Sequence, residues 1–233
     1  MATEVKQKQA TGQTTEVSSE EKVVQTARQF WDRNSKFITY TLGVLVLVVG
    51  GYFVYKTMFV APEEKKAEEM IWKAQEYYKV DSFAKALNGD GVNPGFLRVI
   101  SRHGGTKAGN LAKFYAGSCY LELGDFNNAI KYLKDFSTSQ PALKVRAYGL
   151  LGDAYSELGK KQEAIEYYTK AGNAFKDDEV NAPEYLFNAA LLHQELGKNK
   201  EAIALLKRIK DEYPDAARAL DVDKYLARMG EVN

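Results

Sequence analysis

The sequence predicts an all-α protein in which a single N-terminal transmembrane helix is followed by a helical solenoid. Two observations support this class. Residues 37–55 form an uncharged, almost wholly apolar run, and about 20 such residues span a hydrocarbon core of about 30 Å as a helix. Further along, a pattern of small and bulky residues starts at positions 110, 145 and 183, and repetition at such a period is typical of helical solenoids.

The transmembrane helix is expected over Phe37–Phe59. A backbone in lipid must satisfy its own hydrogen bonds, which requires a helix here. Tyr40 near one end, and Tyr52 and Tyr55 near the other, match the aromatic belts of membrane helices. Lys56 can reach the interface from the last turn. The alternative is a buried core helix of a soluble protein.

The apolar run is expected to be an uncleaved signal anchor that crosses the membrane once. It is longer than the apolar region of a signal peptide, which has about 7–15 residues, and its far end lacks a small-x-small cleavage site. The charges leave the orientation open, because basic residues flank the run equally on both sides. They are Lys22, Arg28, Arg33 and Lys36 before it, and Lys65, Lys66, Lys73 and Lys79 after it.

Two segments precede the anchor. Residues 1–19 are polar, without an apolar period, and are expected to form a disordered tail. A capping box over Ser18–Glu21 then starts a short amphipathic juxtamembrane helix over residues 20–36. Its apolar face either rests on the headgroups or docks on a partner. The residues of this face are Val23, Val24, Ala27, Phe30 and Trp31.

Gly43 and Gly50 lie seven residues apart, and therefore on one face of the transmembrane helix. Small residues at such a spacing let a partner helix approach closely. We predict a membrane-helix contact at these two glycines. A tether that faces only lipid is the alternative.

Residues 63–109 are expected to form a degenerate N-terminal helical pair after an exit turn at Pro62. An amphipathic stripe runs from Glu63 to Leu87, with Asp81–Ser82 as a break. The run Asn88–Gly91 ends this helix as a turn. A calcium loop is the less favoured alternative, because the further oxygen ligands and the closing Glu of an EF-hand are missing.

A second short helix of this pair is expected over Gly95–His103. The two glycines that follow it stop the helix, and His103 can bond its terminal carbonyls. Thr106 can then cap the next helix.

Three copies of one pattern fill residues 110–214, at 110–143, 145–178 and 183–214. Each copy has a small residue in its first half, a Gly near its middle and an Ala in its second half. The small residues are Gly117, Gly152 and Ala190; the central glycines are Gly124, Gly159 and Gly197; the alanines are Ala129, Ala164 and Ala202.

This pattern resembles the tetratricopeptide repeat, a helix-turn-helix unit of about 34 residues in which small residues let helices A and B approach. The central glycines are expected to form the turn within each repeat. Pro141 and Pro214 end two of the copies, whereas the extra segment Asp177–Ala182 predicts a looser joint between the second and third repeats. Residues 215–233 are expected to form a capping helix.

No catalytic or cofactor motif is recognisable, and no cofactor or metal is expected. The net charge of +1 gives no indication of a nucleic-acid partner, and the chain has only two histidines and one cysteine. Cys119 lies in helix A of the first repeat without an evident base, so a packing role is favoured over catalysis. His193 takes a helix A position held by Tyr120 and Tyr155 in the other copies.

Helix A of a tetratricopeptide repeat lines the concave face, where solenoids bind partners. We predict that partner-binding residues lie at the second, fifth, ninth and twelfth positions of each copy. Two apolar patches flank a polar centre there, which favours an extended apolar segment or a partner helix. The alternative is that the two phenylalanines only pack. The predicted residues are Leu111, Phe114, Ser118, Leu121, Arg146, Asp153, Phe187, Leu191 and Gln194.

The anchor followed by repeats is similar to one family, the membrane-anchored tetratricopeptide proteins of the ancillary SecYEG translocon subunit (YfgM-like) type. The stretches Ala86–Gly91, Gly95–Leu97, Gly104–Asn110 and Tyr115–Gly117 resemble its Bacteroidota version. This resemblance implies a non-enzymatic protein of the bacterial inner membrane, with a cytoplasmic N-terminus and periplasmic repeats. The implied partners are the translocon, a membrane-anchored periplasmic chaperone and exported polypeptides.

Two other functions remain open at this stage. One is a structural scaffold for an envelope complex, such as outer-membrane protein assembly or division, although such systems commonly use a lipoprotein anchor. The other is an organellar outer-membrane adaptor with cytosolic repeats.

Overall fold

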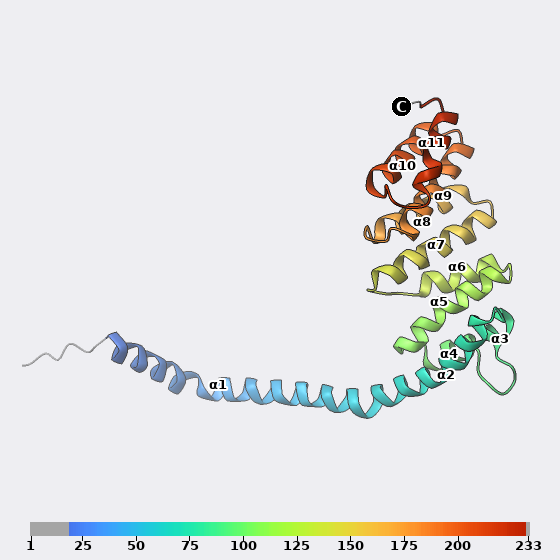
Figure 1. The fold of residues 1–233 in the computed structure, drawn as a ribbon. Helices are drawn as coiled ribbons and strands as arrows, with labels where there is room; N and C mark the ends of the chain where they lie inside the picture. Colours follow the sequence, from blue (N-terminus) through green and yellow to red (C-terminus); the bar gives the residue numbers. More distant parts are fainter. Residues whose placement is uncertain (1–18, 232–233) are drawn as a thin grey trace, which may run out of the picture. The chain divides into compact units, whose positions relative to one another are not determined.

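The computed structural model describes residues 19–231, and nearly all of them lie in helices. This confirms the all-α class. The chain divides into two units, one ending at Met58 and the other beginning at Phe59. Figure 1 shows the order of the helices along the chain. The predicted tail, except Ser19, and the Ser18 half of the predicted capping box lie outside the described residues.

The first unit contains one uninterrupted helix, α1 (Ser19–Tyr55). The predicted juxtamembrane helix and the apolar run therefore belong to a single element. It is the one described helix that is long and apolar enough to cross a membrane, and its most apolar window is not buried at all. That exposure argues against a soluble core helix, because a core helix would be covered by its own protein.

Threonine hydroxyls near the ends of the apolar run are satisfied by the helix itself. Thr41 donates to the Phe37 carbonyl at 2.9 Å, and Thr57 donates to the Phe53 carbonyl at 2.9 Å. Such back-bonding removes the need for water or a partner at these side chains. The run is thus compatible with a lipid environment along its length.

The second unit begins with α2 (Ala61–Lys79), which follows a π-helical turn, Lys56–Val60. The exit turn predicted at Pro62 is wrong, because Pro62 occupies the first turn of α2. A proline is tolerated there, since the first N–H groups of a helix lack intrahelical partners in any case. The predicted break is confirmed: Asp81 has a φ of 56° and follows the end of α2.

Two short helices follow, α3 (Phe83–Asn88) and α4 (Phe96–His103). The loop between them is a turn held by Asp90. The Asp90 carboxylate accepts bonds from the Val92 and Asn93 backbone N–H groups at 2.9 and 2.5 Å. It also accepts a bond from the Tyr77 hydroxyl at 2.5 Å, and these donors hold the pKa of Asp90 well below its usual range.

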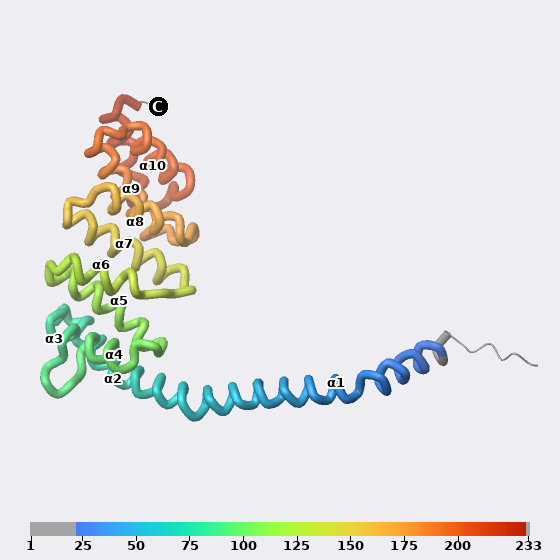
Figure 2. The backbone as a smooth tube through the Cα atoms, turned by 180° about the vertical axis from the view of Figure 1, so that it is seen from behind, coloured from blue at the N-terminus to red at the C-terminus, as the bar shows by residue number. Residues whose placement is uncertain are grey.

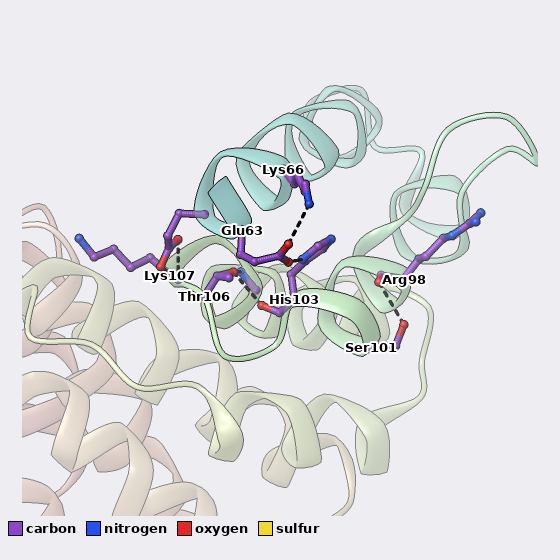
Figure 3. Close-up of polar contacts among 9 residues, drawn as sticks. Glu63, Lys66, Arg98, Ser101, His103, Thr106 and Lys107 are labelled. Carbon is purple, nitrogen blue, oxygen red and sulfur yellow. Dashed lines mark hydrogen bonds and ion pairs between the residues drawn. The ribbon is translucent and has the colours of Figure 1, made fainter. Parts of the chain in front are cut away.

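The first turn of α2 is fixed to the far end of α4, as Figure 3 shows. Glu63 pairs with Lys66 at 2.9 Å and with His103 Nδ1 at 3.0 Å, and the Glu64 carboxylate accepts from the Lys107 N–H at 3.0 Å. His103 thus bonds a carboxylate rather than the terminal carbonyls predicted for it. Thr106 caps α5 as predicted, accepting from the Gly109 N–H at 2.9 Å.

The remaining helices stack in pairs, as Figures 1 and 2 show from opposite sides. The first pair is α5 (Lys107–Glu122) with α6 (Phe126–Asp135), and the second is α7 (Pro141–Glu157) with α8 (Lys161–Ala174). The third is α9 (Asn181–Glu195) with α10 (Asn199–Glu212), followed by α11 (Ala219–Arg228).

The small residues allow the close helix approach that the pattern predicts. A Cβ atom on Gly117 would lie 2.5 Å from Leu133 Cγ, and one on Gly152 would clash with the Tyr168 ring. Ala190 takes this place in the third pair and is fully buried. The three central glycines have φ values of 78°, 68° and 71°, which confirms their role as turn residues. They are Gly124, Gly159 and Gly197.

The joint between the second and third pairs is closely packed, so the looser joint predicted from the extra segment is wrong. Asp178 turns the longer linker by accepting from the Asn181 N–H at 2.9 Å. Gly172 of α8 then lets Leu186 of α9 pack against it, with no room for a Cβ atom. The Tyr168 and Tyr185 rings stack across the same joint at 6.1 Å.

Candidate interaction groove

The first helices of the three pairs form one continuous face. Helix α5 contacts α7, and α7 contacts α9, whereas α6, α8 and α10 make no comparable contact with one another. Elements on the inside of a curved array lie closer together than those on the outside. Helices α5, α7 and α9 therefore line the inner, concave face, where the sequence places its predicted binding residues.

The structure brings two of the predicted residues together in one hollow. Leu121 at the end of α5 and Asp153 of α7 line a space of about 420 Å³. Phe126 adds a second apolar side chain, and Glu122 and Glu157 add two carboxylates. We call this the acidic hollow.

Asp153 is fixed within this hollow by the helix pair behind it. The Tyr168 hydroxyl donates to Asp153 Oδ1 at 2.7 Å. Burial raises the pKa of Asp153 despite this bond, and the neighbouring Glu157 and Glu122 add to the rise. The same burial raises the pKa of Tyr168, so its hydroxyl stays a donor at neutral pH.

A second hollow of about 230 Å³ lies where α2 approaches α5 and α7. Phe114 and Arg146, two of the residues predicted to bind a partner, line it with Tyr115 beside them. The α2 side chains of this hollow were not found from the sequence, because α2 lies outside the three copies of the pattern. They are Gln75, Tyr78 and Lys79. We call this the basic hollow.

Three predicted contact residues are packed inside the domain. Phe114 and Phe187 are each 2% exposed and Ser118 is 3% exposed. The Phe187 ring meets Tyr225 edge-on at 4.9 Å, and Ser118 hydrogen-bonds the Tyr78 hydroxyl at 2.8 Å. The prediction that the two phenylalanines form open apolar patches is wrong, since their neighbours along the solenoid cover them.

The centre of the groove is filled by the protein itself. Gly149 leaves a gap on α7, and the Tyr185 ring of α9 occupies it so closely that a Cβ atom on Gly149 would clash with the ring. Tyr185 of the third repeat thus fills the space beside Gly149. It stands one position after Glu184, and the repeat positions alone did not indicate it.

The predicted groove residues of the third repeat mostly contact other residues of the same domain. Glu184 pairs with Arg218, whose Nε donates to Glu184 Oε2 at 2.8 Å. Leu191 is half-buried against the core beneath α11, and Gln194 is half-buried in α9. Neither lines either hollow.

Cys119 is a packing residue, as predicted, and His193 is half-buried in α9. Cys119 is fully buried, and burial raises the pKa of its thiol to about 12, so it is not a nucleophilic thiolate at neutral pH. His193 lacks a hydrogen-bond partner for its buried Nδ1 among the described residues. Within residues 19–231, no cluster of His, Cys, Asp or Glu that could hold a metal ion is found.

The glycines of α1 are open. No atom lies within 4 Å of where a Cβ atom would stand on Gly43 or Gly50. Their predicted contact with a partner helix stays a prediction.

Comparison with known proteins agrees with this geometry. Models of the tetratricopeptide repeat match residues 111–142, 145–171 and 184–216. The three helix pairs are tetratricopeptide repeats. Such repeats typically bind proteins and do not catalyse reactions. None of the curated proteins matches the sequence.

Two solved structures have a similar fold. One, titled "Crystal structure of MamA", has 19% sequence identity and a TM-score of 0.53, and the match covers 68% of this chain and 85% of that one. The other, "Crystal structure of MamA protein", has 18% identity and a TM-score of 0.51, with 72% and 84% covered. At this identity the likeness concerns the fold alone.

Proposed function

We propose that the protein is a membrane-anchored adaptor that binds partner or client polypeptides through the concave face of its repeat domain. The acidic hollow between α5 and α7 carries this proposal, because Leu121 and Phe126 offer apolar surface beside three carboxylates. A site that combines apolar contacts with a few polar groups can both bind and orient a polypeptide segment. The exposed apolar helix α1 supports the anchoring role.

The proposed setting is protein export at the bacterial inner membrane. In this proposal the N-terminus is cytoplasmic, the repeats are periplasmic, and the partners are the Sec translocon and a membrane-anchored periplasmic chaperone. Its support is the resemblance of the anchor and repeats to the ancillary translocon subunits. Nothing in the groove favours the envelope scaffold more strongly, so that function remains the alternative.

Site-specific crosslinking in native membranes tests the groove. A photoreactive residue at position 121, at the mouth of the acidic hollow, should trap SecY, a periplasmic chaperone or an exported polypeptide. The same residue at Lys200, exposed on the outer helix α10, is the matched control. Equal capture at both positions, or no adduct at position 121, would overturn the proposal.

Protease protection tests the orientation separately. Protease added to spheroplasts should digest the repeat domain while leaving cytoplasmic markers intact. Digestion only after the inner membrane is opened would place the repeats in the cytoplasm and remove the export role.

A further inference from the structure

The solenoid contains two arginine–phenylalanine pairs whose phenylalanines are equivalent by repeat position. Arg218 lies over the Phe187 ring at 4.5 Å, and Arg146 lies over the Phe114 ring at 5.9 Å. In both pairs the phenylalanine is the fifth residue of one repeat, and the arginine follows it across the joint to the next. The two corners share the phenylalanine position but not the place of the arginine, because Arg146 lies within α7 and Arg218 stands just before α11.

The two corners differ in what faces the guanidinium. Arg218 holds the Glu184 carboxylate through Nε and a second, shorter bond. Glu184 is the second residue of its repeat, and Leu111 takes that position in the first repeat. The Arg146 side chain is exposed and, beyond its contact with the Phe114 ring, forms no ion pair or hydrogen bond with any of the described residues.

The surroundings of Arg146 form a site and not merely an exposed charge. Arg146 and Lys79 both line the basic hollow of about 230 Å³. The half-buried Tyr78 and Tyr115 supply the aromatic walls, and the buried Phe114 ring borders the hollow. Lys79 already pairs with Glu76 at 3.0 Å across the exposed surface, where such a pair is weak and easily exchanged.

We propose that the basic hollow binds an Asp or Glu side chain of a partner polypeptide, held by Arg146 in the way that Arg218 holds Glu184. A planar guanidinium accepts a carboxylate through two parallel bonds. The aromatic walls suit an apolar residue next to that acid. The proposal rests on the proposed function, because it names the chemistry of the polypeptide that the groove takes.

Selection and titration of peptides test this site. Random peptides displayed on phage are selected on the full-length protein in detergent micelles, and an enriched peptide is titrated by fluorescence anisotropy. Enriched peptides should share an acid beside an apolar residue. Changing that acid to its amide, or Arg146→Gln in the protein, should weaken binding about tenfold, as expected for losing a charged hydrogen-bonded pair.

The controls separate this inference from the proposed function. Arg98→Gln changes an exposed arginine of α4 that forms no ion pair with the described part of the chain, and it should leave the affinity unchanged. Peptides that bind equally well to the Arg146→Gln variant would overturn the carboxylate site while leaving groove binding intact. Sensitivity to amidation of the peptide C-terminus, but not of the internal acid, would also overturn it. Failure to select any peptide would count against both.

A substitution inside the chain tests the geometry without a ligand. Leu111→Glu puts a carboxylate at the repeat position that Glu184 occupies, and a carboxylate that pairs with Arg146 should raise the melting temperature above that of Leu111→Gln. Leu111→Glu should also block the enriched peptides. The difference between the two variants should vanish when Arg146→Gln is added. Equal melting temperatures with Arg146 present would show that the corner does not hold a carboxylate.

Discussion

The carboxyl group of Asp153 lies where burial opposes its ionisation. Because its folded pKa is raised, the folded state binds a proton more readily than the unfolded state, and ionised Asp153 lowers the free energy of unfolding at neutral pH. Asp153→Asn keeps an oxygen that can accept from the Tyr168 hydroxyl. We expect this variant to unfold at a higher urea concentration than the wild type at pH 7.

The gain in unfolding free energy from Asp153→Asn should be larger at higher pH. It should be full above the folded pKa of Asp153, shrink as the pH falls through that value, and disappear below the ordinary value of 3.8. Asp211→Asn, at an exposed position, should show no such gain. A destabilised Asp153→Asn variant would mean that the bond from Tyr168 needs the charged form.

Phe114 is a core residue, and this changes the outcome expected for a charge at that position. Phe114→Glu would bury a carboxylate at a site that is 2% exposed. Removing a buried phenylalanine alone costs about 3–5 kcal/mol, and the unpaired charge adds to this cost. We expect loss of cooperative unfolding by circular dichroism, whereas Phe114→Leu should stay folded. A Phe114→Glu protein that stays folded would instead support the prediction that Phe114 belongs to an open apolar patch.

His193 should make the domain sensitive to mild acid. Burial lowers its folded pKa from the ordinary 6.5, and the nearby Lys198 adds to the effect. The unfolded chain then takes up the proton first, so stability is present above 6.5 and is lost as the pH falls through the lower folded value. His193→Tyr, with the residue of the other two repeats, should lose less stability between about pH 7 and pH 5.

The chain's other histidine provides the control. The His103→Asn variant should lose as much stability in mild acid as the wild type, because His103 and His193 lie in different helices. Unfolding midpoints measured across this pH range would distinguish them. Identical pH profiles for the wild type and His193→Tyr would contradict the assignment.

Single residues also mark the limit of what the sequence could predict about the groove. Helical spacing decides which side of helix A a residue occupies, and Leu121, Arg146 and Asp153 line the hollows; their contact with a partner stays a prediction. Repeat positions could not tell that Phe114 is covered, since coverage depends on the neighbouring helix. Nor could they find Lys79, which comes from a helix outside the pattern.

At the scale of elements, each helix pair depends on a small residue where its two helices meet. The Tyr168 ring lies against Gly152 and is held by its bond to Asp153 and its stacking on Tyr185, so it cannot move aside easily. Gly152→Leu should therefore cost about 1–3 kcal/mol of unfolding free energy by overpacking. Chemical denaturation of the full-length protein in detergent measures this cost.

A second glycine provides the matched comparison. Gly105 has open space where a Cβ atom would stand, so Gly105→Ala should change stability by no more than about 0.5 kcal/mol. If Gly152→Leu were equally neutral, helices α7 and α8 would not need this close approach.

Elements were predicted best where the sequence carries a strong local signal. The turn glycines, the Thr106 cap and the break near Asp81 all follow from the backbone preferences of those residues. The exit turn at Pro62 was wrong because proline suits the first turn of a helix as well as a loop. The tight joint after α8 was also missed, since a longer linker does not prevent packing between the helices that it connects.

At the scale of the whole molecule, the three cores of the repeat domain draw on residues 67–226 and on none from α1. Because burial of apolar surface supplies most of the folding free energy, the domain should not need α1 to fold. We expect a fragment of residues 61–233 to be helical, monodisperse without detergent and cooperative in thermal unfolding. The full-length chain should require detergent.

The cut position matters for this experiment, because the first turn of α2 belongs to the domain. Glu63 bonds His103, and Glu64 bonds the Lys107 N–H, so these contacts join α2 to α4 and α5. A fragment that begins at residue 67 loses both and should melt at a lower temperature than the fragment that begins at 61. If both fragments melted alike, these contacts would add nothing to the domain. If the longer fragment aggregated without detergent, the repeat domain would depend on the membrane helix, and the division of the molecule into an anchor and an independent binding domain would be wrong.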